Sequence, residues 1–232
     1  MSVDHSLTYR RRALRNLPHR LRLRKILAIL DRLDDKHPFA DAGCSNGYLT
    51  DIIARRYDLP DAIGYDRDRN NLAVAHERHP DLEFRYLDLT GPDTPQDEYG
   101  LVTCFETLEH VPALEEAIAA LVRMVRPGGH LLITVPIEIG LIGAGKFVAK
   151  TLILRQRLQE LERKGGRKIS TLRYFTDVLC YRDISKYRDF PAEVFHTHFG
   201  FDHRRVDRAL TSMGADFRRE IAWTTACYVV SR

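Results

Sequence analysis

The chain has 232 residues, of which 44% are hydrophobic and 29% are charged, a length and a balance typical of one folded α/β domain. Its four cysteines lie far apart without a CxxC pair, which argues against a zinc knuckle, a thioredoxin-like redox pair and a disulfide framework. The N-terminus lacks the apolar segment of a secretory signal, so we expect a cytoplasmic protein with reduced thiols.

The net charge of +4 is distributed unevenly along the chain. Residues 1–40 carry a net charge of +6, residues 41–140 carry −10, and residues 141–205 carry +7. The basic segments are suited to an anionic substrate or to peripheral contact with an anionic membrane surface. Solvated arginines and lysines without a dedicated partner are the alternative.

Residues 1–37 form a basic N-terminal extension. Its leucines recur at helical spacing with arginines between them: Leu14, Leu17, Leu21, Leu27 and Leu30. We therefore expect a basic amphipathic helix that ends near Asp34 and is placed to cover a functional site.

Between residues 38 and 136, short apolar segments alternate with helical patterns. The segments expected as strands are 38–43, 62–66, 82–88, 99–105 and 130–135, and those expected as helices are 46–57, 70–78 and 113–125. This alternation predicts right-handed βαβ units and a parallel sheet in an α/β fold.

Residues 137–205 interrupt the alternation and exceed the length of an ordinary connection, so we expect an inserted cap that selects the substrate. A helix is expected over residues 141–161. The aromatic and histidine residues that follow could stack on a ring or a base, but a small satellite core is the preferred interpretation for most of them. Tyr181 and His198 are the functional candidates among them.

Residues 206–232 close what we expect to be a single domain. The last helix is expected over residues 201–213, and strands are expected at 217–223 and 226–230.

The segment Phe-Ala-Asp-Ala-Gly-Cys-Ser-Asn-Gly-Tyr-Leu-Thr begins at residue 39 and predicts a strand, a tight glycine turn and a helix. Asp41 ends the strand, and Gly43, Ser45 and Gly47 follow at alternate positions. A dinucleotide-binding loop requires a different glycine spacing, so that interpretation fits poorly. A tight turn without any ligand remains the alternative.

Two further aspartates follow the next two expected strands. Asp66 lies 19 positions beyond Gly47, where a carboxylate can accept both hydroxyls of a ribose, and Asp88 could accept a hydrogen bond from an adenine amino group. Each alone is an ordinary residue of a turn. Together with Asp41 they place three carboxylates at the sheet edge where α/β proteins bind ligands.

These motifs, taken in order, resemble those of class I S-adenosylmethionine-dependent methyltransferases. They are Asp41-Ala-Gly-Cys-Ser-Asn-Gly47, Asp66, Asp88, Phe105-Glu-Thr-Leu-Glu-His110 and Arg126-Pro-Gly-Gly129. The resemblance implies a Rossmann-like sheet of seven mostly parallel strands, with an antiparallel last strand and helices on both faces.

The resemblance also implies a cofactor site. It places Gly43 and Gly47 against the methionine part of S-adenosylmethionine, Asp66 on the ribose and Asp88 near the adenine. Asp41 and Ser45 belong to the same loop. Ser45 departs from the family pattern, which often has a glycine there.

The segment Glu106-Thr-Leu-Glu109-His110 follows the fourth expected strand, beside the transferable methyl group. Glu106 is expected to approach the cofactor, while His110 or Glu109 takes the proton of an acceptor hydroxyl. The same E-x-x-E-H pattern resembles segments of ubiquinone-pathway O-methyltransferases and small-RNA 2′-O-methyltransferases that bind a divalent ion. In that case His198 or His203 would be a further ligand.

Three roles of this segment therefore stay open: a proton acceptor, a divalent metal site formed by Glu106, Glu109, His110 and His198, and a merely structural turn. The proton acceptor is preferred to the metal site. We expect no metal to be required.

The expected reaction is methylation of an oxygen atom of a small or lipid-linked acceptor, such as a sugar or phenolic precursor of neutral or anionic character. A nucleic-acid 2′-O-methyltransferase is the alternative enzyme. A non-catalytic subunit that binds S-adenosylmethionine and acts in regulation or as a scaffold is the alternative from another class.

Overall fold

The computed structural model describes residues 17–153, 170–188 and 198–232. Parts of some predictions lie outside these ranges, namely the start of the N-terminal helix and the end of the helix predicted over 141–161. No helix within the described ranges combines the length and the apolar character that crossing a bilayer requires.

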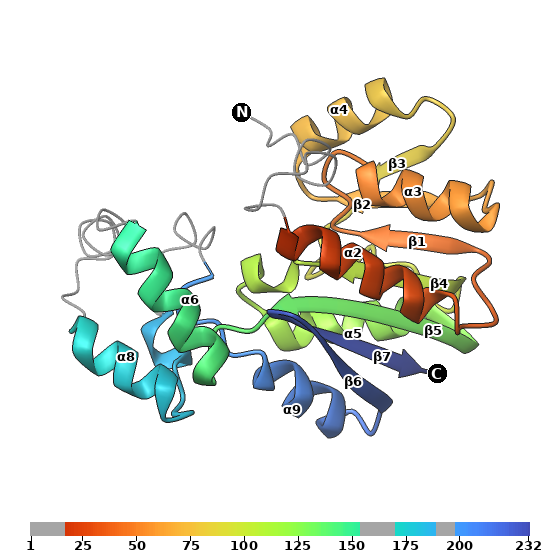
Figure 1. The fold of residues 1–232 in the computed structure, drawn as a ribbon. Coiled ribbons are helices and arrows are strands. Elements are labelled where there is room, and N and C mark those ends of the chain that lie inside the picture. Colours follow the sequence, from red (N-terminus) through yellow and green to blue (C-terminus); the bar gives the residue numbers. More distant parts are fainter. Residues whose placement is uncertain (1–16, 154–169, 189–197) are drawn as a thin grey trace.

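A seven-stranded sheet with the order β3-β2-β1-β4-β5-β7-β6 forms the centre of the fold (Figure 1). The strands β1 to β5 pair in parallel, whereas β7 is antiparallel to β5 and to β6. Their bounds are β1 Phe39–Ala42, β2 Ile63–Asp66, β3 Glu83–Tyr86, β4 Tyr99–Phe105, β5 Val125–Pro136, β6 Asp216–Ala222 and β7 Thr225–Ser231. The predicted seven-stranded sheet with an antiparallel last strand is confirmed.

Helices cover both faces of the sheet (Figure 1). One face carries α2 (Leu17–Leu30), α3 (Tyr48–Tyr57) and α4 (Arg69–Arg78), and the other carries α5 (Leu114–Met124) and α9 (Arg204–Ser212). Apolar side chains of α2 and α3 meet those of the strands in one extensive core, those of α5 and α9 do so in another, and α4 packs in a smaller cluster with Phe84 of β3. The sheet is therefore buried on both sides, and every residue of β1 and β4 is buried without alternation.

Local signals set the start of the two helices nearest the sheet edge. The helix α3 begins after Gly47, whose φ of 74° is costly for a residue with a side chain. The helix α4 begins after Asp68, whose side chain accepts a hydrogen bond from the backbone N–H of Asn70. Both helices therefore start directly beyond the carboxyl ends of β1 and β2.

The insertion after β5 contains α6 (Gly140–Ile153), α8 (Thr171–Leu179) and the short helix η3 (Ser185–Tyr187), which lie beside the sheet rather than over a face (Figure 1). Tyr174, Val178 and Ile184 form a small core there with Ile139 and Ala144. The rings of Tyr174 and Phe199 stack with centroids 4.1 Å apart. The structure thus agrees with a satellite core for most aromatic residues of this segment.

We predict that Ile29→Ala lowers the free energy of unfolding by about 2–5 kcal/mol, because Ile29 of α2 is completely buried against the sheet and its loss leaves a cavity. Urea denaturation followed by circular dichroism measures the change. Leu17→Ala, at the exposed start of the same helix, is the control and should have little effect. Equal costs for the two variants would contradict the packing of α2 on the sheet.

Candidate active site

A cavity of about 380 Å³ lies beyond the carboxyl ends of β1, β2 and β4. Its volume is within the range of small-molecule sites. Its lining includes most of the residues predicted to bind a cofactor: Asp41, Gly43, Ser45, Asp66, Asp88 and Glu106. Gly47 packs instead beneath the loop, where an added Cβ would lie 2.6 Å from the ring of Phe84.

The loop from Gly43 to Gly47 is held tightly against the ends of neighbouring strands. Gly43 has a φ of 81°, and a Cβ there would lie 2.2 Å from Oγ1 of Thr107. Ser45 also has a positive φ, 50°, which is unfavourable for a residue other than glycine. Its N–H donates to Oδ2 of Asp66 over 2.8 Å, so the loop is fixed to the end of β2.

Asp41 is buried at the end of β1 and joins three elements. Its carboxylate accepts hydrogen bonds from Oγ1 of Thr50 in α3 (2.6 Å) and Oγ1 of Thr103 in β4 (2.8 Å). Burial raises the pKa of Asp41 to about 6, although both hydroxyls act in the opposite direction. Asp41 therefore positions the loop as well as lining the cavity.

Asp66 and Asp88 present carboxylates to the same cavity. Asp66 accepts from the N–H groups of Ser45 and Asp68, both at 2.8 Å, and burial raises its pKa. Asp88 accepts from the N–H and the hydroxyl of Thr90, which lower its pKa. Because each carboxylate oxygen has two lone pairs, these bonds fix the side chains and leave acceptor capacity for a ligand.

Glu106 follows β4 and pairs with an arginine that the sequence analysis did not single out. Nη1 of Arg22, in α2, lies 2.6 Å from Oε2 of Glu106, and both residues line the cavity. The side chain of Arg22 is only 11% exposed. The sequence did contain a signal that Arg22 faces inward, because Arg22 shares a helical face with the buried Ile26 and Ile29. The prediction that the N-terminal helix covers the site agrees with this contact.

Asn46 is a second residue that the sequence analysis missed. It is buried and lines the cavity, and its Nδ2 has no hydrogen-bond partner within the described ranges. A buried amide without a partner is costly, so this group is suited to a ligand.

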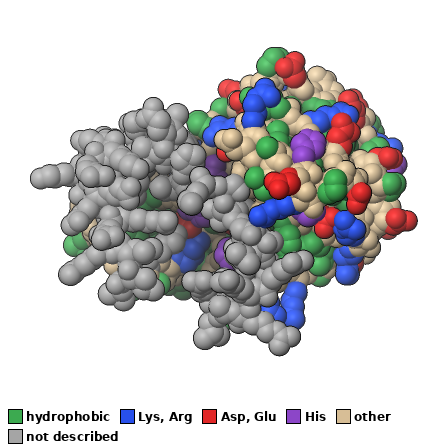
Figure 2. Space-filling view, turned by 90° about the horizontal axis from the view of Figure 1, so that it is seen from above, with side chains coloured by type: hydrophobic (Ala, Val, Ile, Leu, Met, Phe, Trp, Pro, Cys, Tyr) green, Lys and Arg blue, Asp and Glu red, His purple; other side chains and the backbone are tan. Residues whose placement is uncertain are grey.

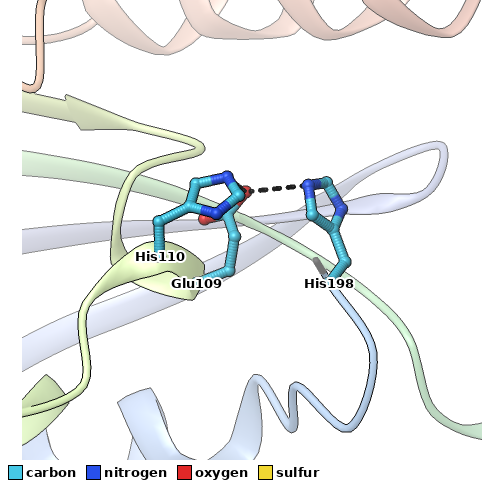
Figure 3. Close-up of side chains that lie close together, drawn as sticks. All are labelled: Glu109, His110 and His198. Carbon is cyan, nitrogen blue, oxygen red and sulfur yellow. Dashed lines mark ion pairs between the residues drawn. The ribbon is translucent and has the colours of Figure 1, made fainter. Parts of the chain in front are cut away.

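Glu109, His110 and His198 meet beside the cavity (Figure 3). The first two belong to the short helix η2 (Leu108–His110), and His198 comes from the segment before α9. Oε1 of Glu109 lies 3.7 Å from Nε2 of His198 and 3.9 Å from Nε2 of His110. Residues distant in the sequence thus form one cluster, which we call the Glu–His cluster.

Glu109 is the buried member of the Glu–His cluster. It is 0% exposed, and neither carboxylate oxygen has a hydrogen-bond partner among the residues that the structure describes. Burial and the neighbouring charge of Glu106 raise the pKa of Glu109 well above its usual range. Such a carboxyl group needs a proton or a cation beside it.

The cluster can act on a ligand in two ways. His110 lines the cavity, so its imidazole can accept a proton there. One carboxylate and two imidazoles with donor atoms within 4.8 Å of one another also suit a divalent cation, which fits the unpartnered oxygens of Glu109.

The structure brings His198 but not His203 into the cluster. His203 is buried at the start of α9, where its carbonyl accepts from Tyr228. Tyr181, the other candidate of the insertion, is 56% exposed and packs on Gly140. Glu138, which was not predicted, lies 3.6 Å from Nδ1 of His198 and pairs with Lys146.

We predict that the stability of the wild type, relative to Asp41→Asn, falls by about 3 kcal/mol between pH 3 and pH 8. The folded chain holds the proton of Asp41 up to about pH 6, whereas the unfolded chain releases it near 3.8, so folding loses stability as the pH rises between these values. Urea denaturation of both proteins across this range measures the difference. A difference independent of pH would show that Asp41 keeps its ordinary acidity in the folded chain.

Comparison with known proteins identifies the family of the chain. A family model described as a methyltransferase domain matches residues 8–189. Ubiquinone biosynthesis O-methyltransferase of Aeromonas salmonicida is 35% identical over 98 residues, which cover 40% of this chain and 41% of that protein. The enzyme of the same name from Alkalilimnicola ehrlichii is 34% identical over 117 residues, covering 48% and 46%. The match thus spans less than half the length of these relatives.

Solved structures share the fold at low sequence identity. An S-adenosylmethionine-dependent methyltransferase from Mesorhizobium loti has a TM-score of 0.61 and 15% identity, with 91% of this chain and 98% of that chain covered. The methyltransferase domain of bacterial CtHen1 has a TM-score of 0.59 and 14% identity, with 93% and 100% covered. The chain belongs to the methyltransferase-domain family, and its fold is shared with solved S-adenosylmethionine-dependent methyltransferases.

Proposed function

We propose that the chain transfers the methyl group of S-adenosylmethionine to an oxygen atom of a small or lipid-linked acceptor. The observation that carries this proposal is the Glu–His cluster, which lies where the cofactor cavity meets the insertion. A group that takes up a hydroxyl proton is needed there for O-methylation. The relatives named ubiquinone biosynthesis O-methyltransferase support an oxygen acceptor.

The residues around the cavity fit S-adenosylmethionine. The cofactor supplies an activated methyl group on a positively charged sulfur. Asp66 would hold the ribose hydroxyls, Asp88 the adenine, and the loop that contains Gly43 and Ser45 the methionine part. Arg22 would pair with the carboxylate of that part, since it is the cation that α2 brings to the cavity wall beside Glu106.

His110 is proposed as the proton acceptor for the acceptor hydroxyl. It lines the cavity, and its Nε2 lies 3.9 Å from Oε1 of the buried Glu109. Arg22 of α2 and Glu106 pair at the cavity wall with side chains only 11% and 18% exposed, which would limit contact of the cavity with water. Most of the rate enhancement would come from holding the oxygen in line with the methyl group and the sulfur.

A divalent cation is the second candidate for activation of the hydroxyl. It is favoured by the donor atoms of Glu109, His110 and His198, which lie within 4.8 Å of one another. A bound cation would lower the pKa of the hydroxyl and hold it in place. The base and the cation use the same residues, so they must be distinguished by experiment.

Methylation of nucleic acid receives less support from the described charges. In α2, Arg22 pairs with Glu106, and Lys25 pairs with Glu220. Figure 2 shows acidic and basic side chains interspersed on the described part of the face in view. Only a nucleic-acid enzyme should bind oligonucleotides with a steep dependence on salt, which separates the two functions.

We predict that Asp66→Ala abolishes binding of S-adenosylmethionine, because this carboxylate both lines the cavity and fixes the loop at Ser45. Isothermal titration calorimetry should give micromolar binding to the wild type, about −8 kcal/mol, and none to the variant. Asp81→Ala, at an exposed position, should bind as the wild type does. If Asp66→Ala binds S-adenosylmethionine as tightly as the wild type does, Asp66 does not hold the ribose. If the wild type binds none, the chain is non-catalytic or depends on a partner.

We predict that His110→Ala lowers turnover by about 100-fold or more and leaves the affinity for S-adenosylmethionine unchanged, because its imidazole acts on the acceptor. Transfer of a labelled methyl group to phenolic acceptors measures turnover. The control is His37→Ala, at an exposed position ahead of β1. Unchanged turnover would remove His110 from the reaction.

Exhaustive chelation before the same assay separates the proton acceptor from the divalent cation. Full activity after chelation excludes the cation, and a loss of activity that a divalent metal restores excludes a metal-free base.

A further inference from the structure

Arg188 is a buried arginine that lies behind the Glu–His cluster. It follows η3 and is 9% exposed. Its Nη2 donates to the carbonyl oxygen of Glu109 over 2.5 Å, and its Nη1 donates to the carbonyl oxygen of Phe199 over 3.3 Å. One guanidinium group therefore binds the backbone of two segments that are far apart in the sequence.

These two segments carry the members of the Glu–His cluster. The carbonyl of Glu109 belongs to the peptide bond that leads into His110, and Phe199 directly follows His198. The distance of 3.7 Å between Glu109 and His198 thus depends on two backbones that Arg188 holds together. A lysine has a single nitrogen at its end and cannot reproduce the fixed fork of a guanidinium group.

Neighbouring residues pack closely around the side chain of Arg188. Gly200 has a φ of 70°, and a Cβ there would lie 2.8 Å from Cγ of Arg188. The N–H of Gly200 donates to the hydroxyl of Tyr174, and the guanidinium carbon lies 5.6 Å from the centroid of the Phe201 ring. Burial lowers the pKa of Arg188 to about 10, so the side chain keeps its charge at neutral pH.

We propose that Arg188 is a positioning residue for methyl transfer, which sets the separation of Glu109 and His110 from His198. This inference rests on the proposed O-methylation. Arg188 itself does not belong to the cavity lining, so it acts through the cluster and not through the cofactor. Its loss should therefore affect the transfer step and spare cofactor binding.

The test compares Arg188→Met, Arg188→Lys and the control Arg182→Met, whose side chain pairs with Asp177 in the same insertion and is 63% exposed. We expect Arg188→Met to lower kcat by about 100-fold, since small misplacements of reacting groups have effects of this size. The dissociation constant for S-adenosylmethionine should stay unchanged, measured well below the melting temperature of each variant. Arg188→Lys should recover part of kcat and keeps the test decisive if Arg188→Met does not fold.

Two kinetic outcomes would overturn the proposal. One is a kcat for the Arg188 variants equal to that of Arg182→Met. The other is a loss of kcat that is accompanied by an equal loss of cofactor affinity, because this would indicate a general disturbance of the fold.

A measurement without turnover separates this proposal from the proposed function. The ring resonances of His110 and His198, assigned by their loss in His110→Asn and His198→Asn, report the geometry of the cluster. We expect them to shift or broaden in the Arg188 variants and to stay in place in Arg182→Met. If the wild type transfers no methyl group to any acceptor, the proposed O-methylation fails, while unchanged resonances in both Arg188 variants would refute the positioning role on their own.

Discussion

The parallel pairing of β1, β2, β3 and β4 is the constraint on which the site depends. It brings the carboxyl ends of strands that are separated in the sequence to one edge of the sheet. Asp41 in β1, Asp66 in β2 and Glu106 directly after β4 reach the same cavity only because these strands end together. The hydrogen bond from Ser45 to Asp66 then fixes the glycine loop across this edge.

The Glu–His cluster beside the cavity does not follow from the strand ends alone, because its residues come from both the sheet and the insertion. Glu109 is buried with two oxygens that lack hydrogen-bond partners among the described residues, and His110 and His198 approach it from two segments. Arg188 links these segments through their backbones. In the proposed function, the core of the fold would bind the cofactor, and the insertion would complete the groups that act on the acceptor.

Sequence reasoning predicted the parts of the site that follow from strand ends. Gly43, Asp66 and Asp88 could be located because a glycine turn and strand-end carboxylates have local signatures. Arg188 could not, because a buried arginine resembles a solvated one in the sequence and its contact with Glu109 joins residues 79 positions apart. The contact between Glu138 and His198 was missed because it too joins residues that are distant in the sequence.

The measurement that tests the central claim most directly is a crystal structure of the chain with S-adenosylhomocysteine bound. We expect the ribose hydroxyls on Asp66 and the sulfur directed toward the Glu–His cluster, with His110 exposed to the space that an acceptor would occupy. A product bound outside the strand-end cavity, or a sulfur directed away from the cluster, would contradict the proposed site of methyl transfer.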